Sequence, residues 1–358
     1  MQMNPKLQET INGIKPVSRE WRLKARDYLN QLAMPQGSLG ELLVLAEQLA
    51  AIKETLKPSV QKKIIVTMAG DHGVVEEGVS AFPQEVTPQM VNNFVRGGAA
   101  INVLAAVVGA QVLVVDMGVA ADLEKLVREK KILSYKIGSG TSNMAKGPAM
   151  TRTQAEQALQ SGIEIVGNLV RDGVELLATG DMGIGNTTSS SAILSVFSGR
   201  PVCEVTGRGT GISNAALENK IRVIEKAIAI NEPDAQDPLD VLAKVGGFEI
   251  GGIAGIILGA AYHKVPVVVD GFISSAGALV AKALAPNSVD YMIAAHRSLE
   301  YGHSLLLEEL GLKPLLNLNL RLGEGTGAAL AMNIIEAAAQ VIGKMLTFEA
   351  AGVTDRDM

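Results

Sequence analysis

The first indication of the fold class is the stretch Ile64-Ile65-Val66-Thr67-Met68-Ala69-Gly70-Asp71-His72-Gly73. It begins with an apolar run that lacks the alternation of polar and apolar residues found in a half-exposed strand. A strand that is apolar on both faces is typical of a parallel sheet covered by helices on both sides. The stretch therefore predicts a buried strand whose carboxyl end leads into a polar, glycine-containing loop.

Similar short apolar runs recur along the chain, separated by segments with helical periodicity. They occupy residues 112–115, 175–178, 202–205, 267–269 and the surroundings of 291–293. Strands that alternate with helices in this way indicate an α/β protein. We therefore predict a doubly wound parallel sheet. Helices are predicted between the strands at 153–171, opened by a capping box of Thr153 and Glu156, and at 187–197 and 213–230.

Both ends of the chain have helical patterns without strands. In the first 55 residues, Ser18 and the Ser38/Glu41 pair resemble helix N-caps, and an alanine-rich helix is predicted from Gly325 to Leu346. We expect residues 1–60 and 323–358 to pack together as a small helical domain. Residues 61–322 would then form the large α/β domain with the nucleotide site.

The composition excludes several classes of protein. The chain has 358 residues, of which 47% are hydrophobic and 19% charged, so it is not intrinsically disordered. Its 32 basic and 37 acidic residues give a net charge of −5 without a basic run, so we expect no nucleic-acid partner. The uncharged stretch 97–115 is interrupted by glycines and polar residues, so we expect no membrane span.

The single cysteine, Cys203, lies in a predicted strand and is expected in the core. One cysteine cannot form an internal disulfide or a cysteine-based zinc site. The polar N-terminus lacks the apolar core of a signal peptide, so we expect a cytoplasmic protein.

The segment Gly180–Thr188 has the features of a phosphate-binding turn. It follows a predicted strand, contains three glycines and enters a predicted helix, where free backbone N–H groups can hold an anion. It matches G-x-x-x-x-G-K-[ST] except that Asn186 replaces the lysine, which disfavours triphosphate hydrolysis. A monophosphate would need only N–H groups, the Thr187 and Thr188 hydroxyls and a distant cation. The alternative is a plain glycine turn that joins strand to helix.

The segment Gly323-Glu324-Gly325-Thr326-Gly327 places one carboxylate among three glycines at the start of a predicted helix. A glutamate there could simply complement the helix dipole. That interpretation leaves the glycines unexplained, whereas a ligand that approaches the backbone closely requires them. We therefore favour a functional role for Glu324.

Histidines occur in two places where they could bind a metal or take part in catalysis. His296, Glu300 and His303 have the spacing of one helix face, which resembles a metal site, but no further histidine or cysteine is nearby, so we expect hydrogen-bonding roles and no metal. Asp71 and His72 follow the first strand, where an orienting role and a catalytic role are both open.

Together these loops resemble the family of nicotinate-nucleotide:dimethylbenzimidazole phosphoribosyltransferases, which make α-ribazole phosphate for the lower ligand of cobamides. The resemblance covers nearly the whole chain, from Pro35 to the last helix. It rests on the segments Ala69–Val74, Gly78–Pro83, Met182–Thr188, Asp270–Ile273, His296–Ser298 and Arg321–Gly327.

The resemblance implies a Rossmann-like parallel sheet with a small helical bundle made from both chain ends. It also implies a homodimer whose active site is closed by the neighbouring subunit. The reaction would transfer the phosphoribosyl group of nicotinate mononucleotide to 5,6-dimethylbenzimidazole with inversion, without a cofactor or metal. Another base such as adenine or a phenol, or a non-catalytic nucleotide-binding module, remain the alternatives.

The resemblance also implies roles for individual residues. Glu324 matches the catalytic base, and Asp181 stands at an active-site position where glutamate is expected. The substrate-binding positions fall into three groups. They are Ser80, Gln89 and Leu322 for the benzimidazole; Gly183, Gly185, Asn186, Thr187, Thr188 and Lys220 for the phosphate and ribose; and Ser298 and Gly327 for the nicotinate.

Overall fold

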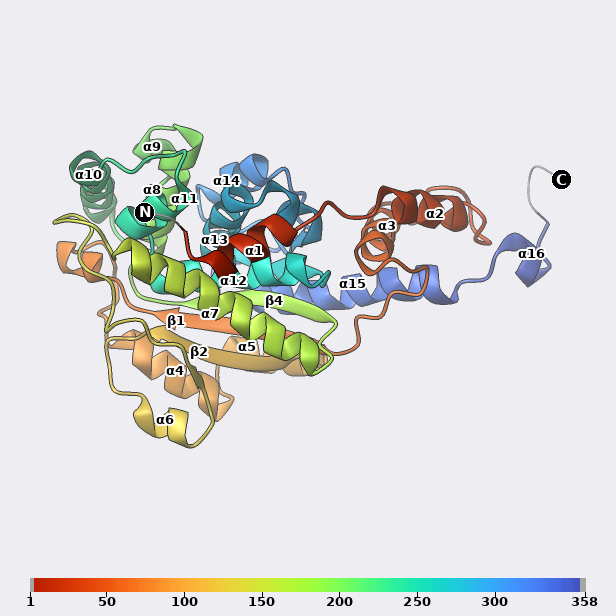
Figure 1. Cartoon of the computed structure of the whole chain (residues 1–358), viewed down its shortest axis with the longest axis horizontal. Coiled ribbons are helices and arrows are strands. Elements are labelled where there is room, and N and C mark those ends of the chain that lie inside the picture. Colours follow the sequence, from red (N-terminus) through yellow and green to blue (C-terminus); the bar gives the residue numbers. More distant parts are fainter. Residues whose placement is uncertain (1–2, 355–358) are drawn as a thin grey trace.

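The computed structural model describes residues 3–354, which form a six-stranded parallel sheet with helices on both faces (Figure 1). The strands are β1 (Lys63–Gly70), β2 (Gln111–Gly118), β3 (Leu133–Ser134), β4 (Leu176–Met182), β5 (Val267–Val269) and β6 (Met292–Ala294). Their order is β3-β2-β1-β4-β5-β6, and every pair is parallel. This is the Rossmann strand order. Strands β2 and β3 are added on one side of β1 and strands β4 to β6 on the other, so the order of the strands reverses between β1 and β4. The predicted fold class is confirmed.

The sheet separates two hydrophobic cores. On β1, Ile64, Val66 and Met68 face one core, whereas Ile65 and Ala69 face the other. The first core is shared with α1 (Pro5–Gly13), α7 (Arg152–Arg171), α8 (Asn186–Ser198), α10 (Asn214–Asn231), α11 (Pro238–Val245), α12 (Phe248–Tyr262), α13 (Gly271–Leu284) and α14 (His303–Leu310). The second is shared with α2 (Arg19–Leu29), α3 (Glu41–Lys53), α4 (Val86–Arg96), α5 (Ala100–Val107) and α15 (Thr326–Lys344). The shorter helices are η1 (Gly73–Glu77), α6 (Glu124–Arg128), α9 (Val202–Val205), η2 (Pro286–Tyr291) and α16 (Phe348–Ala351).

The two ends of the chain meet on the second face of the sheet. Helix α15 packs on α3, α5 and α2, and Ala33 N–H donates to Leu346 O at 2.9 Å (Figure 1). These helices share their core with one face of the sheet, while α1 packs on α12 and α7 at the other face. The proposed division into a small domain of residues 1–60 and 323–358 and a large domain of 61–322 stays a prediction.

The prediction of a strand at residues 202–205 is wrong. It forms the short helix α9 on the N-cap Pro201, and Val202 and Val205 are buried while Cys203 is exposed. Burial at i and i+3 is the spacing of a helix face. The expectation that Cys203 is a core residue is therefore also wrong.

Two of the predicted helix caps are also displaced. The capping box of α7 is Thr151 with Gln154, two residues before the predicted pair Thr153 and Glu156. Helix α3 follows Gly40 without a side-chain cap, so the Ser38/Glu41 box does not form. The Ser18 cap is confirmed, because its hydroxyl accepts a hydrogen bond from Trp21 N–H at 3.3 Å. Helices α8, α10 and α15 begin within a residue of their predicted starts.

One helix within residues 3–354, α15, is long and apolar enough to cross a membrane by composition. More than half of it is buried, and its apolar side chains belong to the second core. The stretch 97–115 contains α5 and the start of β2.

Candidate active site

A cavity of about 780 Å³ opens at the carboxyl ends of β4, β5 and β6, next to the point where the strand order reverses. This is where open α/β sheets bind ligands. Glu324, the start of α8 and the loop after β6 line it, together with apolar side chains from α4 and α13. The polar lining residues are Asp181, Asn186, Thr187, Thr210, His296, Ser298, Glu300, Asn319, Arg321 and Glu324.

Glu324 is held on a left-handed turn at the wall of this cavity. Gly323, Glu324 and Gly325 have φ angles of +83°, +62° and +98°, and such a conformation is unusual for a residue with a side chain. One carboxylate oxygen, Oε2, accepts a hydrogen bond from Ile101 N–H at 3.2 Å. Burial raises the pKa of Glu324, and the Ile101 N–H opposes this rise. A carboxylate with a raised pKa in a cavity is suited to accept a proton near neutral pH.

Asp181 lies beside this turn, at the end of β4. The strand runs to Met182, so Gly180 and Asp181 belong to the strand and not to the loop that the sequence predicts. The Asp181 carboxylate accepts from Asn186 Nδ2 at 3.0 Å and borders Gly323. Burial, followed by repulsion from Asp270, raises the pKa of Asp181 well above its usual value. Asp181 therefore takes up a proton more readily than an ordinary aspartate, and its part in the reaction stays a prediction.

The turn after β4 contains only two of the three predicted glycines, Gly183 and Gly185. Gly185 has φ of +95° and precedes α8, which starts at Asn186. Ile184 N–H is held by the Thr87 hydroxyl at 3.1 Å. The first turn of α8 thus faces the cavity, where its positive dipole end favours an anion.

Lys220 stands behind this turn. Its ammonium donates to Thr187 Oγ1 at 2.8 Å although the side chain is 1% exposed. Burial lowers the pKa of Lys220 to about 8, and the nearby Glu300 carboxylate opposes that shift. Thr187 therefore lies at a polar end of the cavity, with Lys220 behind it.

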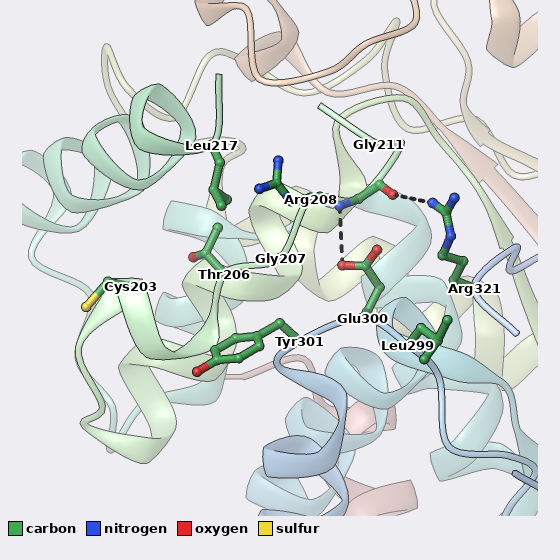
Figure 2. Close-up of a pocket in the computed structure, with 11 residues that line it drawn as sticks. Cys203, Thr206, Gly207, Arg208, Gly211, Leu217, Leu299, Glu300, Tyr301 and Arg321 are labelled. Carbon is green, nitrogen blue, oxygen red and sulfur yellow. Dashed lines mark hydrogen bonds between the residues drawn. The ribbon is translucent and has the colours of Figure 1, made fainter. Parts of the chain in front are cut away.

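A second cavity of about 520 Å³ adjoins this end and shares Gly209, Glu300 and Arg321 with the first. Gly209 N–H donates to Glu300 Oε2 at 3.3 Å, and Arg321 donates to Gly209 O at 3.4 Å. Gly209 belongs to the loop of residues 207–211 between α9 and α10, and Figure 2 shows the Glu300 carboxylate and the Arg321 guanidinium pointing toward this loop. The loop therefore forms the wall between the two cavities.

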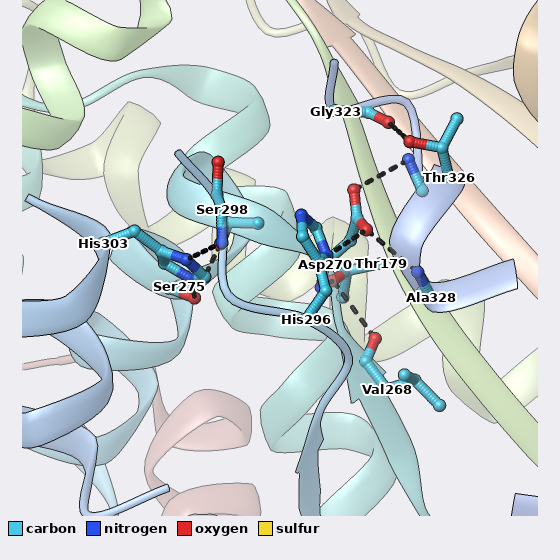
Figure 3. Close-up of polar contacts among 12 residues, drawn as sticks. Thr179, Val268, Asp270, Ser275, His296, Ser298, His303, Gly323, Thr326 and Ala328 are labelled. Carbon is cyan, nitrogen blue, oxygen red and sulfur yellow. Dashed lines mark hydrogen bonds and ion pairs between the residues drawn. The ribbon is translucent and has the colours of Figure 1, made fainter. Parts of the chain in front are cut away.

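His296, Glu300 and His303 do not share a helix face. His296 follows β6, and α14 begins only at His303. His303 Nδ1 accepts from Ser298 N–H at 2.8 Å, and its other ring nitrogen lies 3.1 Å from Ser275 Oγ (Figure 3). Burial lowers the pKa of His303 to about 3, so this ring is neutral. Among residues 3–354, no group of three or more His, Cys, Asp and Glu side chains is arranged to hold a metal ion.

His72 forms a buried support beneath the glycine turn, and the neighbouring Asp71 accepts a hydrogen bond from Ala120 N–H at 2.8 Å. His72 Nε2 lies 2.6 Å from Glu249 Oε1, and its Nδ1 lies 3.0 Å from Ser189 Oγ on α8. His72 is 1% exposed and packs beside Gly185. Of the two roles left open by the sequence, the orienting one fits these buried contacts.

The predicted substrate-binding residues fall into three sets, which line the cavity, lie behind its wall or lie outside it. Gly183, Asn186, Thr187, Ser298 and Leu322 line the cavity together with Asp181 and Glu324. Gly185, Thr188, Lys220 and Gly327 lie one layer behind the wall, while Ser80 and Gln89 lie outside it near Phe82 and Met90, which do line it.

Asp270 and His296 were not predicted as substrate or catalytic residues. His296 lines the cavity, and its ring packs against Gly327, where any Cβ would overlap it. Asp270 follows β5 directly, so the rule that ligands bind beyond strand ends could have singled it out.

A doubly wound sheet whose cavity is lined by a carboxylate and by a helix N-terminus is suited to an enzyme that binds a phosphorylated ligand. A family model described as "Phosphoribosyltransferase" matches residues 14–353. The nicotinate-nucleotide–dimethylbenzimidazole phosphoribosyltransferases of Syntrophobacter fumaroxidans and Geobacter sulfurreducens are each 55% identical over 351 residues, covering 98% of this chain and 99% of the relative. The crystal structure of CobT from Thermus thermophilus superimposes with a TM-score of 0.90 at 46% identity, covering 94% of this chain and 99% of that one. The chain belongs to the nicotinate-nucleotide–dimethylbenzimidazole phosphoribosyltransferase family.

Proposed function

We propose that this enzyme transfers the phosphoribosyl group of nicotinate mononucleotide to 5,6-dimethylbenzimidazole, giving α-ribazole 5'-phosphate and nicotinate. The observation that supports this most is the Glu324 carboxylate on its left-handed turn, in the same cavity as the start of α8. The names of the relatives supply the two substrates. The reaction belongs to nucleotide loop assembly in cobamide synthesis, and we place it in the cytoplasm.

The phosphate would bind at the first turn of α8. Gly183, Gly185, Asn186, Thr187 and Thr188 would supply N–H groups and hydroxyls, with Lys220 as the cation. The nicotinate would lie toward Ser298 and Gly327, and the benzimidazole toward Leu322, Ser80 and Gln89. Leu322 is 58% exposed at the cavity mouth, where a flat apolar ring could cover it.

The leaving group explains why one carboxylate suffices. In nicotinate mononucleotide the glycosidic nitrogen is a pyridinium, so cleavage of the C–N bond gives a neutral ring without a general acid. The benzimidazole attacks the anomeric carbon through its unprotonated nitrogen from the opposite face, which inverts the configuration. Glu324 then takes the proton from the other ring nitrogen. Holding the two rings on opposite sides of one carbon supplies further acceleration.

Replacing Lys220 with alanine should raise the KM for nicotinate mononucleotide more than the KM for the base. A charge-assisted contact contributes roughly 1.5–3 kcal/mol, which corresponds to about 10–150-fold. In the wild type, kcat/KM for the nucleotide should fall above pH about 8, where Lys220 loses its proton, and this alkaline limb should be absent from the variant. Steady-state kinetics at pH values on both sides of this pKa measure both effects.

Lys226→Ala on the exposed face of α10 is the matched control and should change neither KM. Equal increases in both KM values for Lys220→Ala would argue against a phosphate contact.

Removal of divalent metals should leave turnover intact. A pyridinium leaving group does not need a Lewis acid, and a phosphate monoester can be held by helix N–H groups and an ammonium. The assay is dialysis against EDTA followed by turnover in metal-free buffer. Loss of activity that returns with stoichiometric zinc or magnesium would overturn this mechanism.

We also propose that the enzyme is a homodimer in which the neighbouring subunit closes the active site. Large apolar side chains that line the two cavities, or neighbour a lining residue in the sequence, are each more than half exposed, and exposed apolar side chains that gather in a patch are typical of an interface. They are Phe82, Leu299, Tyr301, Leu318 and Leu322.

Leu318→Asp should therefore convert a dimer to a monomer in sedimentation experiments. Val107→Asp, at the end of α5 on the opposite edge of the sheet, should leave the mass unchanged. A monomeric wild type would contradict the proposal.

The identity of the acceptor base can be tested with a panel of similar rings, because an apolar pocket discriminates such rings only weakly. A panel of dimethylbenzimidazole, benzimidazole, adenine and a phenol, with nicotinate release followed by chromatography, ranks the bases by kcat/KM. We expect dimethylbenzimidazole first. A higher value for adenine or a phenol would favour the alternative substrate, and no release with any base would favour a binding module.

A further inference from the structure

Asp270 is a completely buried carboxylate that follows β5 and binds the backbone around Glu324. Its Oδ2 accepts a hydrogen bond from Gly325 N–H at 3.1 Å, and its Oδ1 accepts from Ala328 N–H at 2.9 Å (Figure 3). Helix α15 starts at Thr326 on the N-cap Gly325, whose own residue type offers no capping side chain. Asp270 therefore caps this helix from a different part of the fold.

The peptide between Glu324 and Gly325 is held from both sides. Asp270 accepts from its N–H, and the buried Thr67 hydroxyl donates to its carbonyl oxygen at 3.0 Å. The preceding peptide is held as well, because Glu324 N–H donates to Asp181 O at 3.2 Å. The left-handed φ of Glu324 thus persists because residues on or next to three neighbouring strands fix its backbone.

This arrangement has a direct consequence for the side chain. The Cα–Cβ direction of Glu324 follows from the orientation of its two peptides, so the contact with Asp270 determines where the carboxylate stands. A displacement of about 1 Å at a reacting group can lower a rate about 100-fold. Asp270 is not among the residues that line the cavity, so it reaches the reaction through this backbone and through the His296 ring, whose Nδ1 lies 3.5 Å from Asp270 Oδ1.

We propose that Asp270 is a positioning residue of the reaction, which holds the Glu324–Gly325 peptide so that the Glu324 carboxylate meets the proton of the incoming base. This inference rests on the proposed role of Glu324. It goes beyond that role because it assigns the catalytic geometry to a residue that contacts no substrate.

Asp270→Asn tests the proposal with little change in volume. The amide keeps one acceptor but places an NH₂ group against the N–H of Gly325 or Ala328. We expect kcat to fall about 30-fold or more, while both KM values change less than about threefold.

Asp116→Asn is the matched control. Asp116 is also buried at a strand end and accepts from two backbone N–H groups, those of Gly118 and Val119, at 3.0 and 2.8 Å. It lies on β2 and does not line the cavity. If Asp270 merely stabilised the fold, Asp270→Asn would lower thermal stability but would change kcat as little as Asp116→Asn does.

A double-mutant cycle separates positioning from stability. In a Glu324→Gln background, Asp270→Asn should lower kcat by less than about threefold, because the group it positions is already lost. Losses that multiply in the double variant would overturn the proposal. Thr67→Val, which releases the same peptide from the other side, should show the same non-additivity and serves if Asp270→Asn does not fold.

The variants also distinguish a failure of Glu324 as the catalytic base from a failure of Asp270 as its positioning residue. If Glu324→Gln alone keeps activity within about threefold of wild type, the role of Glu324 is wrong, whatever the Asp270 variant does. If Glu324→Gln abolishes turnover and the cycle is additive, only the positioning role of Asp270 is wrong.

Discussion

Glu324→Gln should lower kcat by about 10²–10⁴-fold while the affinity for nicotinate mononucleotide is retained. The amide keeps the shape of the side chain and can still accept from Ile101 N–H, but it cannot take a proton from the base. Steady-state turnover and calorimetric titration of the nucleotide measure the two quantities. Activity within about threefold of wild type would contradict the assignment.

The pH profile gives a second readout of this variant. A base must be unprotonated, so wild-type kcat should fall on the acid side as Glu324 is protonated, at a pH above the ordinary carboxyl pKa because burial raises its pKa. Glu324→Gln should lack that acid limb. Glu336→Gln, on the same helix but far from the cavity, should keep both the rate and the profile.

Gly327→Ala should also nearly abolish turnover. Gly327 lies in the first turn of α15, and a Cβ there would overlap the His296 ring, which is itself buried against the cavity wall. Either the ring or the start of α15 must move, and the Glu324 turn precedes that helix directly. We expect a loss of about 100-fold or more in kcat/KM, since the reacting groups lose their alignment.

Gly343→Ala on the same helix is the matched control, because the nearest atom to its new Cβ is 4.0 Å away. A glycine-to-alanine change in an open helical position stabilises a helix by roughly 0.5–1 kcal/mol, so this variant should melt slightly higher and keep its activity. Similar activity in the Gly327 and Gly343 variants would show that the contact with His296 is unimportant.

The pattern of the sequence predicted β1, β2, β4, β5 and β6 because a buried parallel strand leaves a local signature, whereas the exposed two-residue strand β3 was not predicted. Runs such as 64–68 and 267–269 are apolar on both faces, and the loops after them were located with the strands. The run 202–205 failed because four apolar residues fit a short helix equally well, and Pro201 before it suits a helix start.

The parts of the site that depend on contacts between distant segments could not be predicted. Glu324 was found by its glycine neighbours, but the hydrogen bonds that hold it come from Thr67, Asp270 and Asp181, which are far apart in the sequence. Lys220 was assigned through the resemblance alone, and its burial against Thr187 depends on how α10 packs on α8. Local patterns specify elements, whereas these distances depend on tertiary packing.

The anomeric configuration of the product shows whether the base displaces nicotinate directly. The purified enzyme is incubated with nicotinate mononucleotide and dimethylbenzimidazole, nicotinate release is followed, and the anomeric configuration of the nucleotide product is determined by NMR. Direct displacement, in which the base attacks the face opposite the nicotinate and Glu324 accepts its proton, predicts that nicotinate is released only when the base is present and that the product has the α configuration. Release of nicotinate without base, or a β-configured product, would contradict it.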